Sequence, residues 1–351
     1  MDKRYSYNFM REIGEEMKEM VNFDEQNFLK IGASIYEKRS MIEHIAEVIC
    51  KEDFTNLFFT SSGGSQAMMD PFWDMVNEMS DIPVYRMISA EYLACGHNQV
   101  KEGTVAFLAS KSGDTKETMA AAKVLKEKGV RLVSVIGKSD SSLEKISDYS
   151  VVYGDGRPQE LILYLLIGKL LHIEGYFDAY PQFADELKHL PQVLCDVRIA
   201  VDEKAKQYAQ DYHKEPYNIW IGSGNCWPVC YAFAMCVLEE SQWIRTKSVS
   251  SPEFFHGTLE LVEKGVCCTL VVTEGKTREL DLRVKRFLET HTDKFTCFDT
   301  ADYPFAGISD AFRGILSPVV MNAILQRISK NMEAVTEHSL DIRRYYRVES
   351  Y

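Results

Sequence analysis

Ser110-Lys-Ser-Gly-Asp-Thr-Lys-Glu117 is a hydroxyl-rich stretch between an apolar run at 105–109 and a helix-forming segment at 118–128. The apolar run predicts a buried strand, so the stretch lies on a strand-to-helix turn. At such a turn, free backbone N–H groups and the positive end of the helix dipole favour an anion. Three hydroxyls around Gly113 add hydrogen-bond donors without adding charge, which suits a phosphate monoester. The sequence therefore predicts a phosphate-binding turn.

The same residues also make a good turn and helix N-cap without any ligand, because their side chains bond to nearby backbone groups. That role accounts for one or two of the hydroxyls. It does not account for three hydroxyls around one glycine, so phosphate binding is the favoured interpretation. The residues of this turn predicted to bind the phosphate are Ser110, Lys111, Ser112 and Thr115.

The size and composition of the chain limit its class. With 351 residues, 46% of them hydrophobic, the chain can bury a large core and is expected to form two domains. The longest apolar run, at 161–171, falls short of the roughly 18 residues of a membrane span and is typical of a buried helix. No signal peptide is visible at the N-terminus. We therefore expect no membrane association.

Charge and cysteine content exclude further classes. A net charge of −12 without a basic block argues against nucleic-acid binding, which needs cations to displace counterions from the phosphate backbone. The nine cysteines do not follow a zinc-site spacing, so we expect reduced thiols in a cytoplasmic protein. No metal or other cofactor is predicted.

The chain repeats a strand–turn–helix pattern. The pattern that begins at residue 56 returns at residue 218, each time as a short apolar strand, a glycine-containing turn and a helix. The turn at Gly113 follows the turn at Gly63 by 50 residues, and the turn at Gly275 follows the turn at Gly224 by 51. Matching intervals of this kind predict two copies of one α/β unit.

Short apolar strands separated by helices are typical of parallel sheets covered on both faces. We predict an α/β fold of two tandem domains, each a parallel sheet flanked by helices. The predicted divisions are an N-terminal helical segment at 1–40, a phosphate-binding domain at 41–156, a helical linker at 157–212 and a second domain with a C-terminal tail at 213–351. The linker is expected to include a solvated helix around 203–207.

Ligands of such sheets bind beyond the carboxyl ends of the strands, which adds Ser65 to the predicted phosphate contacts. The second copy has Glu274 and Lys276 where the first has Ser112 and Asp114. Phosphate binding is therefore predicted to stay with the first unit, and the second unit is free to supply chemistry.

Two residues of the second unit are candidates for proton transfer. Glu240 ends a long apolar helix, where a carboxylate with a raised pKa can shuttle a proton at neutral pH. His256 lies in Glu253-Phe-Phe-His-Gly257, where the glycine permits a sharp turn and an imidazole can assist proton transfer to a ring oxygen. The neighbouring Glu239 equally fits a surface charge, and Glu253 fits either an orienting partner of His256 or an ordinary surface carboxylate.

These motifs resemble those of sugar isomerase (SIS) domains. The 110–117 stretch is similar to the phosphate loop of such domains, and Gly222-Ser-Gly-Asn-Cys-Trp-Pro-Val229 resembles the second such domain of the isomerase half of glucosamine-6-phosphate synthase. In that family a glutamate at the helix end acts with a histidine sixteen residues on. The interval from Glu240 to His256 is 16, which selects Glu240 over Glu239.

A second resemblance, over roughly residues 45–351, is to the fructosamine-6-phosphate deglycases. Gln242-Trp243, Glu274-Gly-Lys-Thr-Arg278 and Arg343-Arg-Tyr345 look like theirs, and Pro252-Glu-Phe-Phe-His-Gly257 matches apart from a glycine replaced by Pro252. Thr258 also departs from the usual proline. The catalytic C-terminal lysine of the synthase has no counterpart, and no glutamine-hydrolysing domain is present.

The resemblance implies an enzyme that hydrolyses a fructosamine (Amadori) 6-phosphate to glucose 6-phosphate and a free amino acid. In that mechanism Glu240 moves a proton between C1 and C2, and His256 helps to open the sugar ring. The resemblance also implies a homodimer with active sites near the subunit boundary, where His256 or the tail reaches the neighbouring site. Further substrate contacts that it implies are Gly64, Glu253, Arg343 and Tyr345.

Two alternatives stay open. An aldose–ketose isomerase or an amino-sugar-phosphate deaminase would use the same Glu240 and His256. A non-catalytic sugar-phosphate sensor is less favoured, because the chain lacks a basic helix-turn-helix segment and a sensor needs no such pair. The leaving amino acid is also open: a lysine would need an acidic pocket and an aspartate a basic one.

Overall fold

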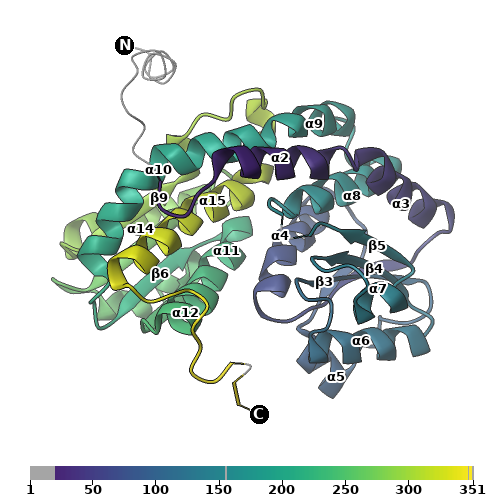
Figure 1. Cartoon of the computed structure of the whole chain (residues 1–351), viewed down its shortest axis with the longest axis horizontal. Helices are drawn as coiled ribbons and strands as arrows, with labels where there is room; N and C mark the ends of the chain where they lie inside the picture. The colour runs from purple at the N-terminus through teal and green to yellow at the C-terminus, as the bar shows by residue number, and fades with distance from the viewer. Residues whose placement is uncertain (1–19, 155, 347, 350–351) are drawn as a thin grey trace.

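The first of two parallel sheets is formed by residues 56–152 (Figure 1). The computed structural model describes residues 20–154, 156–346 and 348–349. The strands are β1 (Asn56–Phe59), β2 (Val84–Arg86), β3 (Thr104–Ser110), β4 (Arg131–Ile136) and β5 (Tyr149–Val152). They pair in the order β2-β1-β3-β4-β5, and every pair is parallel. All residues of β3 are buried, which explains why this strand reads as one apolar run.

The second sheet repeats the arrangement of the first. Its strands are β6 (Asn218–Gly222), β7 (Thr246–Ser250), β8 (Cys267–Val272) and β9 (Phe295–Asp299). Their order is β7-β6-β8-β9, again all parallel, so the first four strands of each unit occupy equivalent places. The predicted α/β fold with two related sheets is therefore confirmed.

Helices follow the strands of the first sheet in regular alternation. They are α4 (Gly63–Met79) after β1, α5 (Ser89–Cys95) after β2, α6 (Lys116–Glu127) after β3 and α7 (Ser142–Ile146) after β4. A helix that follows a strand of a parallel sheet in this way has its N-terminal end at the edge where the strands end. The turn at 110–117 thus lies at the carboxyl edge of the sheet.

The helical segments of the second unit are less regular, and many of them are short. They are η2 (Gly224–Cys226), α11 (Trp227–Ala232), the π-helix η3 (Phe233–Glu239), α12 (Glu240–Gln242), α13 (Ser251–Phe254), η4 (Thr258–Leu261), α14 (Arg278–His291) and η5 (Thr300–Asp302). The long apolar helix predicted before Glu240 is thus interrupted by one π-helical segment, Phe233–Glu239. It ends at Trp243, whose φ of 58° is left-handed. A π-helical segment shifts the register of the residues that follow it, which here include Glu240.

Further helices lie outside the two strand–helix repeats, and several of them are long. They are α2 (Glu25–Tyr36), α3 (Arg39–Lys51), α8 (Glu160–Ile173), α9 (Tyr180–Glu186), η1 (Leu187–His189), α10 (Leu190–Tyr212) and α15 (Asp310–Thr336). In Figure 1, α2 runs along α10, and a side chain in place of Gly32 would come within 2.5 Å of Pro191. The expected N-terminal helical segment is present from residue 25 onward, and residues 1–19 lie outside the described part.

The linker is more deeply packed than a purely solvated helix. Glu203, Lys204 and Gln207 face solvent as expected, but the opposite face of α10 is buried, including Val197, Val201 and Ala205. One hydrophobic cluster contains this face together with α8, α15 and side chains from both sheets. The two units therefore share a core. None of the helices in the described residues is long and apolar enough to cross a bilayer.

Candidate functional site

The turn after β3 is held in shape by its own hydroxyls. The Ser110 Oγ accepts the Gly113 backbone N–H at 3.0 Å and lies 3.0 Å from the Thr115 Oγ1. The Ser112 Oγ accepts the N–H of Asp114 at 3.2 Å. Thr115 precedes α6, so the predicted hydroxyls gather at the positive end of this helix. Lys111 is exposed beside them.

The turn after β1 joins the turn after β3 at the same edge. The Ser61 Oγ donates to the Ala109 carbonyl at 2.5 Å, and the Ser62 Oγ donates to the Glu117 carboxylate at 3.1 Å. Ser65 lies in the first turn of α4, directly after this junction. The structure thus places Ser65 and the 110–115 hydroxyls at the adjacent N-terminal ends of two helices.

Gly64 connects this edge to the second unit. Its backbone N–H points at the Cys236 thiol, and a Cβ on Gly64 would lie 3.6 Å from the Cys236 Sγ. Burial, assisted by the negative charge of Glu240, raises the pKa of the Cys236 thiol to about 11. Cys236 lies in η3, about one helical turn before Glu240. The contact therefore brings the end of the second unit's helix to the edge of the first unit where the predicted phosphate-binding turn lies.

The two adjacent glutamates at this helix end have different partners. The Arg343 Nε donates to the Glu240 carboxylate at 2.7 Å, whereas Glu239 accepts a hydrogen bond from the Thr246 hydroxyl. The Glu240 side chain is 30% exposed, so it is reachable from solvent. This difference separates Glu240 from Glu239 on structural grounds.

The C-terminal tail is anchored over Glu240. Gln242 donates to the His338 carbonyl at 2.8 Å and accepts from the Thr336 hydroxyl at 2.8 Å. The Arg344 guanidinium lies 3.9 Å from the centre of the Trp243 ring, a cation–π contact. Figure 1 shows the tail passing α12 toward the C-terminus. Of the predicted tail contacts, Arg343 is held at Glu240, and Tyr345 is 62% exposed.

His256 is not brought to Glu240 within one chain. Its imidazole is exposed and has no hydrogen bond among the described residues, and its backbone N–H bonds to the Glu253 carbonyl at 3.0 Å. Glu253 is exposed as well. Glu240 precedes β7 and His256 follows it, so the two lie at opposite ends of a strand about 17 Å long.

The second unit's equivalent of the predicted phosphate turn is filled by the protein itself. A side chain in place of Gly224 would come within 2.3 Å of the Thr277 hydroxyl. The Glu274 carboxylate accepts from the Arg313 Nε at 2.8 Å, and the buried Asp281 carboxylate accepts from the Ser251 hydroxyl at 2.6 Å. Carboxylates at this edge would repel a phosphate, which agrees with phosphate binding by the first unit alone.

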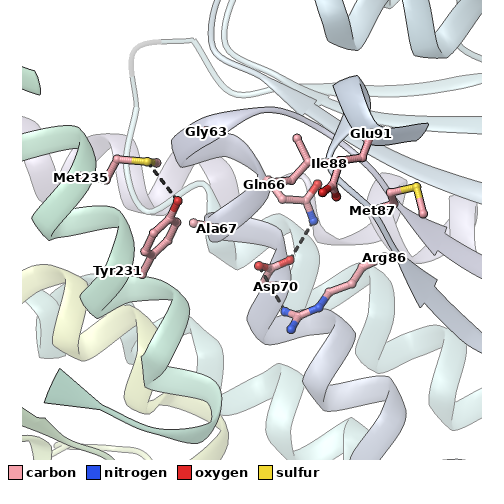
Figure 2. Close-up of a pocket in the computed structure, with 10 residues that line it drawn as sticks. All are labelled: Gly63, Gln66, Ala67, Asp70, Arg86, Met87, Ile88, Glu91, Tyr231 and Met235. Carbon is pink, nitrogen blue, oxygen red and sulfur yellow. Dashed lines mark hydrogen bonds and ion pairs between the residues drawn. The ribbon is translucent and has the colours of Figure 1, made fainter. Parts of the chain in front are cut away.

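A cavity of about 400 Å³ lies beside Gly63, between α4, the segment after β2 and the α11–η3 helix (Figure 2). Asp70 lies between Gln66, which donates to it at 2.7 Å, and Arg86, which pairs with it at 3.2 Å. Burial raises the pKa of Asp70 against these two partners. The sequence does not reveal this group, because α4 and the end of β2 carry no motif that predicts their contact. The described residues hold no cluster of three or more potential metal ligands.

Asp74, one turn beyond Asp70, provides a pH-dependent stability prediction. Burial raises its pKa from 3.8 to about 6, so the folded protein favours the neutral acid. The stability from this group is complete below pH 3.8 and is lost as the pH rises through 6. The advantage of Asp74→Asn over the parent protein should therefore grow by about 2 kcal/mol from pH 4.5 to pH 7.5.

Urea unfolding at both pH values measures this change. Asp81→Asn, at an exposed position just after the same helix, is the matched control and should show no such growth. An Asp74→Asn advantage that is the same at both pH values would contradict the assignment.

Comparison with known families defines the class of this site. Residues 53–159 match the SIS domain family, so this part of the chain is similar to SIS domains. A solved structure from Salmonella typhimurium LT2, titled as a candidate phosphosugar isomerase, superposes with a TM-score of 0.85 and 25% identity, covering 89% of this chain and 97% of the other. A similarly titled structure from Bacillus subtilis gives a TM-score of 0.82 and 27% identity, covering 85% of this chain and 93% of the other. The fold is that of the phosphosugar isomerases.

More particular relatives are enzymes. The chain is 29% identical to fructosamine deglycase FrlB of Bacillus subtilis (strain 168) over 297 residues, which cover 83% of this chain and 90% of that protein. It is 22% identical to a fructoselysine 6-phosphate deglycase of Escherichia coli O157:H7, over 87% of this chain and 89% of that protein. The predicted relation to the deglycases is confirmed, and with it the prediction that the chain is an enzyme.

Proposed function

We propose that this chain hydrolyses a fructosamine 6-phosphate to glucose 6-phosphate and a free amino acid. One observation carries the proposal: the Gly64–Cys236 contact brings Glu240 to the edge where the hydroxyl-rich helix ends of the first unit gather. A phosphate site and a solvent-accessible carboxylate are the two parts that this reaction needs. The similarity to deglycases over more than four-fifths of the chain supports the same reaction.

The phosphate anchors the substrate in this proposal. Ser65, Ser110, Ser112 and Thr115 donate hydroxyl hydrogen bonds, and the ends of α4 and α6 contribute backbone N–H groups. Lys111 supplies a positive charge or its backbone N–H. Holding the remote phosphate fixes the reacting carbons against Glu240 and lowers the entropic part of the barrier.

Glu240 then moves one proton. The carboxylate removes a proton from C1 to give an enaminol and returns a proton to C2, which leaves an imine between C1 and the nitrogen. Water adds to C1, the carbon–nitrogen bond breaks, and the amine leaves with a proton. The Arg343 guanidinium, 2.7 Å from Glu240, orients the carboxylate for both transfers. Gly64 lies beside the same reacting carbons.

The direct test is incubation of the purified protein with fructoselysine 6-phosphate and with 6-phosphofructose-aspartate. Glucose 6-phosphate is read with a coupled dehydrogenase, and the free amino acid is quantified in parallel. The proposal expects equal amounts of both products from at least one substrate. Isomerisation of fructose 6-phosphate with no release of amino acid from either conjugate would instead favour an isomerase.

His256 acts from the second subunit of a homodimer in this proposal, because it lies at the far end of β7 from Glu240 in its own chain. Glu253 accompanies it in the same loop. Glu240→Gln and His256→Ala should each be inactive alone. In an equal mixture of the two variants that has exchanged subunits, half of the dimers contain one subunit of each variant. Each such dimer has one site in which both Glu240 and His256 are intact, so about a quarter of all sites should be active.

Activity of the mixed variants, after subunit exchange has been verified by mass spectrometry, measures this regain. The separate variants at the same total concentration are the control. No regain in a mixture that has exchanged would place His256 outside the neighbour's site, and a monomer by light scattering would do the same.

A further inference from the structure

The cavity beside Gly63 is lined by both apolar and polar side chains (Figure 2). Met87 and Ile88 come from the segment after β2, and Met235 comes from η3. The polar lining is formed by Gln66, Asp70 and Arg86, with Glu91 at the start of α5. At about 400 Å³ the cavity falls within the size range of small-molecule sites.

The cavity is adjacent to the place where the sugar would react. Gly63 and Met235 line it, and the residues that follow them, Gly64 and Cys236, form the contact between the two units. Glu240 lies about one helical turn beyond Cys236. A sugar with C1 at Glu240 therefore has the cavity within reach of the substituent on its nitrogen.

The polar lining is rigid and tied to the phosphate edge. The Gln66 carbonyl oxygen accepts the Ser61 N–H at 2.6 Å, so its amide nitrogen is directed at Asp70. The Arg86 guanidinium is also held by a cation–π contact, since it lies 4.2 Å from the centre of the Trp73 ring. These supports hold a carboxylate and a guanidinium in fixed positions at one end of the cavity.

The charged side chains that line the cavity are two carboxylates, Asp70 and Glu91, and one guanidinium, Arg86, so their net charge is negative. Arg86 balances Asp70, while Glu91 is exposed and has no ion pair in the part of the chain that the structure describes. Asp74 lies one turn from Asp70 on the same helix. This negative charge attracts an ammonium group. The Arg86 guanidinium has five N–H groups, and those that do not contact Asp70 can bind one carboxylate. A substituent with two carboxylates would meet repulsion.

We propose that this cavity binds the amino-acid part of the substrate and selects an amino acid glycated on a side-chain amine, such as lysine on its ε-nitrogen. The methylenes lie along Met87, Ile88 and Met235, the α-ammonium group lies between Asp70 and Glu91, and the α-carboxylate binds Arg86. This assignment rests on the proposed function, and it makes Glu91 and Arg86 determinants of specificity.

The test compares kcat/KM for fructoselysine 6-phosphate and 6-phosphofructose-aspartate. The wild-type protein should prefer the lysine conjugate by about tenfold or more, and Glu91→Lys should reduce this preference by about tenfold. Arg86→Gln should raise KM for the lysine conjugate. Glu127→Lys, an exposed charge reversal on α6, is the control and should leave the preference unchanged. Preference for the aspartate conjugate, or a preference that Glu91→Lys does not change, would overturn the assignment.

Calorimetric binding to Glu240→Gln separates this inference from the proposed function. Fructoselysine 6-phosphate should bind more tightly than fructose 6-phosphate, and the added Glu91→Lys change should remove the difference. If this binding result is obtained but the parent protein hydrolyses neither conjugate, the deglycase reaction is refuted and the assignment of the cavity stands. Hydrolysis with equal binding of the two ligands would refute the subsite and keep the reaction.

Discussion

Glu240→Gln is expected to lower kcat by about 10²- to 10⁴-fold, the usual contribution of a positioned general base. Glutamine has the shape of glutamate, and its amide oxygen still accepts the Arg343 hydrogen bond that is 2.7 Å long in the parent protein. The tail and the helix end should therefore stay in place. The amide cannot take up a proton from C1, so only the chemical step is lost. The coupled glucose 6-phosphate assay measures this change.

Glu239→Gln is the matched control for this change. Glu239 is the preceding residue and bonds to Thr246 instead of Arg343, so its loss should leave kcat within a few-fold of the parent value. Both variants should bind fructose 6-phosphate with parental affinity. Near-normal turnover by Glu240→Gln, or an equal loss in both variants, would remove Glu240 from the mechanism.

Gly113→Ala is expected to disable the phosphate turn. Gly113 has a φ of 69°, and a Cβ there would lie 2.1 Å from the Ser141 Oγ. The backbone conformation alone costs an alanine about 1–3 kcal/mol, and the clash with Ser141 must be relieved by moving the turn. Because the Gly113 N–H bonds to Ser110, such a shift also displaces the hydroxyls around it. The affinity for fructose 6-phosphate should fall by about 100-fold or more.

Calorimetry of fructose 6-phosphate binding, together with urea unfolding, separates the two effects. Gly265→Ala is the control, since Gly265 also has a positive φ of 85° but open space around it. That variant should lose stability and keep its affinity for the sugar phosphate. Parental affinity in a folded Gly113→Ala protein would show that this turn does not hold the phosphate.

Local pattern was enough to predict the architecture of both units. The apolar run before Ser110 is buried along its whole length, and the helix expected at 118–128 forms at Lys116–Glu127. The repeat spacing also predicted correctly that β1 and β6 have equivalent places in the two sheets. Such features depend on neighbours in sequence, where hydrophobic periodicity and turn chemistry act directly.

The parts that the sequence did not reveal depend on contacts between distant segments. The Gly64–Cys236 contact, the ion pair between Glu240 and Arg343, and the Asp70–Arg86 pair each join residues from elements that no local pattern relates. The π-helical segment before Glu240 has no signature in residue type either. The separation of His256 from Glu240 has the same origin, because a spacing of 16 residues does not tell that β7 lies between them.

The hydrolysis of a substrate with two deuterons at C1 tests the central claim most directly. Turnover of fructoselysine 6-phosphate labelled in this way is followed by mass spectrometry and NMR of the sugar phosphate. Because Glu240 must remove one deuteron from C1 before the carbon–nitrogen bond breaks, the account predicts glucose 6-phosphate with a single deuteron at C1. Release of fructose 6-phosphate with both deuterons still at C1 would contradict it, since the bond would then have broken without any proton transfer between C1 and C2.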